Sequence, residues 1–149
     1  MYLKNFKRVE QKYVLNKKEK DALFRRLKMY IEKDIYYQST IENIYFDTVN
    51  DDIIIRSIDK PSYKSKIRLR SYDVPNLDSI VFLEIKRKVD GIVCKRRIGM
   101  KLNEFNNYMN DRKSINSENA QIKNELDYYF DKFNLKKTMY ISYNREAFY

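Results

Sequence analysis

Histidine is absent from this chain, cysteine occurs once, and only 2 glycines and 2 prolines are present among its 149 residues. The missing histidine excludes Ser-His-Asp and Cys-His catalytic groups, zinc fingers and histidine-ligated haem, and a single thiol excludes an internal disulfide. So few glycines exclude a glycine-rich dinucleotide motif or a P-loop. The available chemistry is therefore that of carboxylates, amines, guanidinium groups, hydroxyls and any hard metal ion that carboxylates hold.

Long apolar runs are also missing. The three isoleucines at 53–55 are among the longest, so no segment is predicted to span a bilayer. The first eight residues lack the apolar core of a secretion signal. With one thiol and no such signal, we expect a cytoplasmic protein.

Positive charge is in excess. Lysine and arginine number 31 against 21 aspartates and glutamates, which gives a net charge of +10. Such a field attracts polyanions: nucleic acid, an anionic membrane surface or polyphosphate. The length and the 43% hydrophobic content predict a single domain over 1–149 with a modest core.

The pattern of apolar residues predicts an α+β fold dominated by antiparallel pairing. Asn16, with Glu19 three residues later, forms a capping box that starts a helix, and Asp90-Gly91 between two β-rich runs predicts a hairpin. Ser117 is the predicted cap of the last helix. The expected strands are 6–15, 41–47, 52–58, 64–72, 79–89, 92–100 and 139–148, with two helices between the last two strands.

Charged residues alternate with apolar ones along these strands, and alternate residues share a face. On the strand 64–72, Lys66, Arg68 and Arg70 lie opposite Ile67 and Leu69. The other strands contribute Arg8, Glu10 and Lys12, then Glu84, Lys86 and Lys88, then Lys95 and Arg97, and finally Arg145. Like charges on neighbouring strands repel one another unless an anion lies between them. Two interpretations remain: a curled sheet whose inward charges bind a multiply charged anion, or an ordinary sheet with one solvated face.

Six segments in order resemble the VTC-domain branch of the CYTH, or triphosphate tunnel metalloenzyme, superfamily. They are RVEQKY at 8–13, IYFDT at 44–48, IRLRSY at 67–72, FLEIKRK at 82–88, KRR at 95–97 and YNREAF at 143–148. The resemblance implies an antiparallel β-barrel tunnel with helices packed outside it, whose lysines and arginines bind triphosphate. It also implies Mn²⁺ or Mg²⁺ as cofactor, held by glutamates, and ATP, triphosphate or polyphosphate as partner.

Residues are assigned from the resemblance and the alternation together. The expected phosphate-binding residues are Lys12, Arg68, Arg70, Lys86, Lys95, Arg97 and Arg145, and the expected metal ligands are Glu10 and Glu84. Arg8, Lys66 and Lys88 lie near strand ends, where a solvated rim explains them equally well. For Glu84, neutralising the neighbouring cations is an alternative to binding a metal.

VTC domains are polyphosphate polymerases, so the leading hypothesis is a metal-dependent phosphotransferase that extends polyphosphate from ATP. An inorganic triphosphatase and a non-catalytic polyphosphate-binding module are the alternatives. Specific nucleic-acid binding is disfavoured because no RNP or helix-turn-helix pattern is present. The family's strands after the Y-x-R-x-A-F segment have no counterpart in this sequence. Either the sequence is a fragment, or the protein is natively short with an incomplete tunnel. The missing strands leave open edges, which favour self-association.

Overall fold

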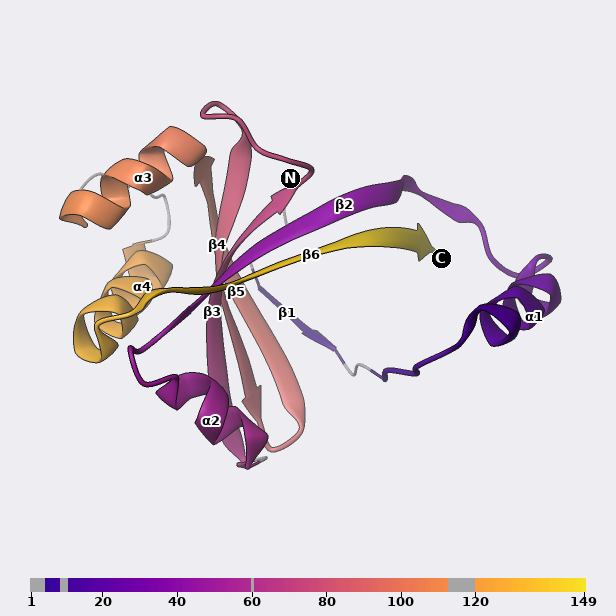
Figure 1. Ribbon diagram of the computed structural model, residues 1–149, viewed down its shortest axis with the longest axis horizontal. Helices are drawn as coiled ribbons and strands as arrows, with labels where there is room; N and C mark the ends of the chain where they lie inside the picture. Colours follow the sequence, from indigo (N-terminus) through magenta and orange to yellow (C-terminus); the bar gives the residue numbers. More distant parts are fainter. Residues whose placement is uncertain (1–4, 9–10, 60, 113–119) are drawn as a thin grey trace.

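The computed structural model shows an antiparallel sheet with helices arranged around it (Figure 1). It describes residues 5–8, 11–59, 61–112 and 120–149, and only the backbone of 5–8. The elements are, in order, β1 (Asn5–Arg8), α1 (Lys17–Leu27), β2 (Lys33–Asp47), α2 (Asp52–Ile58), β3 (Tyr63–Tyr72), β4 (Ile80–Val89), β5 (Ile92–Lys101), α3 (Leu102–Asp111), α4 (Ala120–Phe133) and β6 (Lys136–Phe148).

The six strands lie in the order β1-β5-β4-β3-β2-β6, and every neighbouring pair is antiparallel. The expected α+β fold with antiparallel pairing is therefore confirmed. Within the described residues the sheet does not close, because β1 and β6 form its two edges. The hairpin between β4 and β5 turns at Asp90 and Gly91, which both have positive φ, 46° and 86°, as a type I′ turn requires.

Helices α3 and α4 cover one face of the sheet (Figure 1). Their buried apolar side chains include Phe105 and Tyr108 on α3, and Ile122, Leu126 and Phe130 on α4. These side chains pack against the apolar residues of β3, β4 and β5 in one core cluster. The predicted cap Ser117 lies outside the described residues. No helix in the described part of the chain is long and apolar enough to cross a membrane.

The prediction of a strand at 52–58 is wrong, since these residues form α2. A short apolar run cannot be assigned to helix or strand from periodicity alone. Here the buried carboxylate of Asp47 decides, because it accepts hydrogen bonds from the backbone N–H groups of Ile53 and Ile54, both at 2.9 Å. Those N–H groups belong to the first turn of the helix and have no partner within it.

The first strand is shorter than predicted. β1 ends at Arg8, opposite Val93, and β5 begins only one residue beyond, at Ile92. Residues 11–15 therefore have no strand to pair with, and they are irregular and exposed. The capping box at Asn16 is confirmed: its Oδ1 accepts from the N–H of Glu19 at 3.0 Å, and Glu19 accepts from the N–H of Asn16 at 2.8 Å.

Helix α1 lies away from the other helices, at the far ends of β2 and β6 (Figure 1). Phe24 packs edge-on against Phe148 with ring centroids 5.0 Å apart, and Lys20 pairs with Glu146 at 3.0 Å. The backbones of Glu32 and Tyr149 exchange two hydrogen bonds of 2.9 and 3.0 Å. Helix α1, which follows the segment that leaves β1, is thus attached to the end of β6 by side-chain contacts.

Candidate functional site

The face of the sheet opposite α3 and α4 carries rows of charged side chains across β3, β4 and β5. In one row Lys66, Lys86 and Lys95 are direct cross-strand neighbours; we call it the lysine row. In the next row Arg68, Glu84 and Arg97 are neighbours. The face defined by these six residues, the cationic face, is the one that alternation in the sequence predicts.

Glu84 is at the centre of the cationic face and has no exposed surface. Its carboxylate accepts from Arg68 Nε at 2.8 Å, pairs with Lys95 Nζ, and lies 3.9 Å from Arg97 Nη1. Burial alone would raise the pKa of Glu84, but Arg68 and Lys95 hold it below the ordinary value. The carboxylate is therefore ionised and neutralises part of the positive charge around it.

The charge of Lys95 is the least secure on this face. Burial and, to a smaller extent, the positive charge of Arg97 lower the pKa of Lys95 to about 8. The negative charge of Glu84 acts in the opposite direction but does not outweigh burial. Arg68 behaves differently, because Glu84 and Tyr45 outweigh burial and raise the pKa of its guanidinium. Lys95 is thus the cation whose proton can be lost near neutral pH.

Two arginines of β3 are held by neutral partners on β2 and β6. Arg68 Nη1 donates to Tyr45 Oη at 3.1 Å, and Arg70 donates to Asn43 Oδ1 at 3.0 Å and to Tyr143 Oη at 3.4 Å. Tyr45 and Asn43 were not predicted as site residues from the sequence. Asn43 and Tyr45 alternate along 41–47, so the sequence places both on one face of that strand. Only the pairing of β2 with β3 shows that this is the cationic face.

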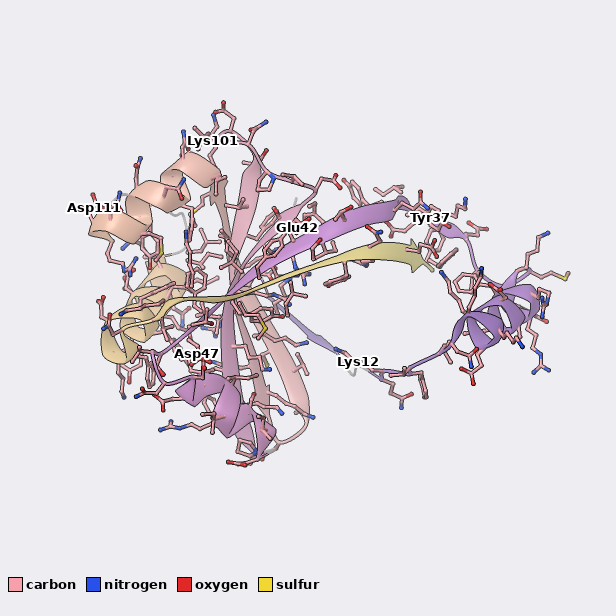
Figure 2. All side chains as sticks on the ribbon, in the orientation of Figure 1. Lys12, Tyr37, Glu42, Asp47, Lys101 and Asp111 are labelled. Atoms are coloured by element: carbon pink, nitrogen blue, oxygen red, sulfur yellow. The ribbon has the colours of Figure 1, made fainter. Side chains whose placement is uncertain are left out.

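A cavity of about 690 Å³ opens over the cationic face. The described lining residues are Lys12, Tyr45, Lys64, Lys66, Arg68, Lys86, Arg87, Lys88, Gly91, Val93 and Tyr143. Seven of them are lysine or arginine and none is acidic. Figure 2 shows Lys12 on the segment between β1 and α1, so this cation comes from outside the sheet. The cavity suits an anion that carries several charges.

The structure brings most of the predicted phosphate-binding residues together. Lys12, Arg68, Lys86, Lys66 and Lys88 line the cavity. Lys95 and Arg97 meet at Glu84, and Arg70 lies on the same face, one alternation along β3 from Arg68.

Five predicted cations are not among the described residues that line the cavity: Arg70, Lys95 and Arg97, which lie on the cationic face, and also Arg145 and Arg8. Arg145 is on β6 opposite Ser39 and lines a separate hollow with Asp73 and Glu146. Arg8 is opposite Val93 in the register of β1 and β5, and its side chain is not described.

Two carboxylates, Glu10 and Glu84, are predicted to hold the implied metal ion. Glu84 does not fit, because both of its oxygens already face cations that would repel Mn²⁺ or Mg²⁺. Within the described part of the chain, no three residues among Asp, Glu, Cys and His gather in a metal-binding group. Glu10 lies outside the described residues and stays a prediction.

The pKa of Lys95 makes a pH dependence measurable. In the folded protein the pKa of Lys95 is about 8, below the ordinary value of 10.5. Between these two values the unfolded chain binds more protons than the folded one, so the free energy of unfolding should rise as the pH increases from about 8 to 10.5. Affinity for a polyanion should fall over the same range, by up to about tenfold per pH unit for one lost proton. Calorimetric titration of tripolyphosphate from pH 7 to 9.5 measures the fall.

Lys95→Arg is the control, since a guanidinium does not titrate in this range, and the difference between the two profiles isolates the contribution of Lys95. If the wild-type and variant profiles coincide, Lys95 does not contribute its proton to binding.

The sequence profile of the VTC domain matches residues 7–149. The chain belongs to the VTC domain family. No sequence among the curated proteins matches it. Among solved structures, a Bacillus halodurans protein provisionally assigned as an adenylate cyclase is similar, with a TM-score of 0.53 and 15% identity. The match covers 93% of this chain and 62% of that one, so the VTC chain spans less than two thirds of its neighbour. At this identity the likeness shows the fold.

Proposed function

We propose that this VTC-domain chain binds the phosphate chain of ATP, triphosphate or polyphosphate over its cationic face, and that it transfers the terminal phosphate of ATP to a growing polyphosphate. The observation that carries the proposal is the lysine row. Three lysines from three neighbouring strands lie side by side, and like charges directly opposite each other destabilise a sheet. Glu84 offsets part of that repulsion through its pair with Lys95, and a bound polyanion lowers the rest.

The spacing of the rows favours a long, thin anion. Successive rows on one face are two residues apart along a strand, or about 6.7 Å. The rows at Lys64, Lys66 and Arg68 of β3 all line the same cavity, so an extended chain of phosphates meets new cations at each step. A base-free phosphate chain also brings its charges closer together than RNA does, so more of them meet the seven described lining cations at once.

The residues on this face suit phosphoryl transfer. That reaction depends chiefly on aligning the phosphates and stabilising their charge, with little need for a strong protein base. A chain without histidine can therefore support it. Arg68, held between Glu84 and Tyr45, is a fixed donor of the kind that binds phosphate oxygens.

The experiment combines binding with product analysis. Calorimetry should show tighter binding of polyphosphate than of RNA with the same phosphate content. Incubation with ATP and Mn²⁺ or Mg²⁺, followed by gel analysis, should show polymers that lengthen with time. Equal binding of the two polyanions would overturn the assignment of the cavity to a phosphate chain.

Product analysis also separates the alternatives from the proposal. Release of inorganic phosphate from tripolyphosphate without polymer growth would replace the polymerase with a triphosphatase. Tight binding with no product would replace it with a polyphosphate-binding module.

A further inference from the structure

A second, smaller cavity lies on the other side of β3, where α2, the start of β3 and the end of α4 meet. Its volume is about 260 Å³. It is lined by Ile53, Arg56, Tyr63, Lys64, Ser65, Tyr128, Tyr129 and Phe133. We call it the tyrosine pocket. The cationic cavity and the proposed phosphate transfer do not use its aromatic side chains.

The rings of the tyrosine pocket are arranged around an open space. Tyr129 stacks on Phe133 with centroids 5.7 Å apart and meets Tyr128 edge-on at 6.0 Å. Tyr129 is only 7% exposed, whereas Tyr128 and Tyr63 are 54% and 48% exposed. A buried aromatic floor with exposed aromatic walls is suited to a flat, unsaturated ring.

The pocket also has a defined polar end. The hydroxyls of Tyr63 and Tyr129 are 2.8 Å apart. Burial raises the pKa of Tyr63, whereas hydrogen bonds from Ser65, Tyr63 and Arg87 outweigh burial and lower the pKa of Tyr129. Either hydroxyl can donate to the other. The guanidinium of Arg87 lies 5.7 Å from the centroid of the Tyr129 ring.

Lys64 connects the tyrosine pocket with the cationic cavity, since it lines both. Its ammonium group donates to the carbonyl oxygen of Ser57 on α2 at 3.3 Å, which holds it at the end of the sheet. Arg56 adds an exposed cation to the pocket rim. A ligand with a ring at one end and phosphates at the other would therefore meet suitable groups on both sides of Lys64.

We propose that the tyrosine pocket binds the base of a nucleoside phosphate, with Lys64 and Arg56 toward its phosphate groups. The volume is smaller than that of sites for drug-sized ligands, about 300–1,000 Å³, and so admits one ring system. Base stacking on aromatic side chains tolerates any base, so the pocket selects nucleotides over inorganic phosphates. This inference rests on the proposed function for the direction of the phosphates, but the pocket itself is separate from the cationic face.

The test compares ATP with inorganic tripolyphosphate on the same variants. Tyr128→Ala removes an exposed wall of the pocket and should weaken ATP binding at least about fivefold, the lower end of the range for one stacked base. It should leave tripolyphosphate binding within twofold of the wild type. Tyr36→Ala is the matched control, because Tyr36 is 74% exposed and lies on β2, away from the pocket.

Photolabelling with an azidopurine analogue of ATP gives a measurement that needs no variant. Labelled peptides should come from α2, the start of β3 or α4, and excess ATP should prevent the labelling. Labelling confined to other segments, or unchanged ATP affinity in Tyr128→Ala, would overturn the inference. If the wild type binds tripolyphosphate but Tyr128→Ala binds ATP normally, the pocket inference fails and the proposed function stands. If tripolyphosphate does not bind, but ATP binds and its affinity falls in Tyr128→Ala, the proposed function fails and the pocket inference stands.

Discussion

Replacing Glu84 with glutamine is expected to lower the free energy of unfolding by about 3 kcal/mol at pH 7, since removing one partner of a buried ion pair costs about 3–5 kcal/mol. Glutamine keeps a hydrogen-bond acceptor, which places the loss at the lower end. Glu84 is fully buried and meets Arg68, Lys95 and Arg97, so three cations would lose their shared anion. For a chain of this size the melting temperature should fall by about 6–12 °C.

The same variant should be rescued by the ligand. Without Glu84 the cationic face has one negative charge fewer, so a bound triphosphate meets less repulsion and compensates the orphaned cations. Tripolyphosphate should therefore raise the melting temperature of Glu84→Gln by more than it raises that of the wild type. Thermal unfolding with and without millimolar tripolyphosphate measures both effects.

Asp127→Asn provides the control on the opposite face. Asp127 on α4 pairs with Lys123 and accepts a hydrogen bond from Tyr108, so its loss also leaves a cation without a carboxylate, and neither partner is among the described residues that line the cationic cavity. That variant should be destabilised but gain no extra stabilisation from tripolyphosphate. Equal rescue of both variants would show that the anion binds without preference for the cationic face.

Arg68→Ala is expected to weaken tripolyphosphate binding by about 1.5–3 kcal/mol, the value of a hydrogen bond to a charged group, which is about 10- to 150-fold in affinity. Arg68 lines the cavity and donates to Glu84. Its removal takes away a phosphate donor and also leaves the carboxylate of Glu84 less neutralised, and both changes disfavour the anion. Isothermal titration calorimetry measures the loss.

Two further variants identify the cause of that loss. Arg68→Lys should recover only part of the affinity, because an ammonium lacks the paired donors of a guanidinium. Arg96→Ala removes an arginine from the opposite face of the sheet, where it pairs with Glu125 of α4, and should leave the affinity for tripolyphosphate nearly unchanged. If Arg96→Ala and Arg68→Ala lose the same affinity, net charge rather than the cavity determines binding.

The cationic face was predictable because a strand places alternate residues on one face whatever its partners are. Lys66 and Arg68 on β3, and Glu84 on β4, needed only the strand boundaries, which the hairpin at Asp90-Gly91 helped to fix. The capping box at Asn16 was predictable for a similar reason, since both of its hydrogen bonds are local.

Features that depend on distant parts of the chain were not predictable from periodicity. Helix α2 forms where a strand was expected because Asp47 caps it, and β1 ends early because β5 runs out beside it. Tyr45 joined the site only through pairing between β2 and β3. In each case the register or a tertiary hydrogen bond overrode the local pattern.

The pairing of β2 with β6 sets an order of events during synthesis. Asn43 and Ile141, which share a hydrogen bond, are 98 residues apart, so β2 waits about 5–20 s on the ribosome for its outer neighbour. During that time its free edge could recruit another nascent chain. Glu42 on β2 places a carboxylate beside that edge. When β6 pairs with β2, the hydroxyls of Tyr140 and Ser142 donate hydrogen bonds to this carboxylate. The same side chain thus places a negative charge beside the unpaired strand and later anchors β6.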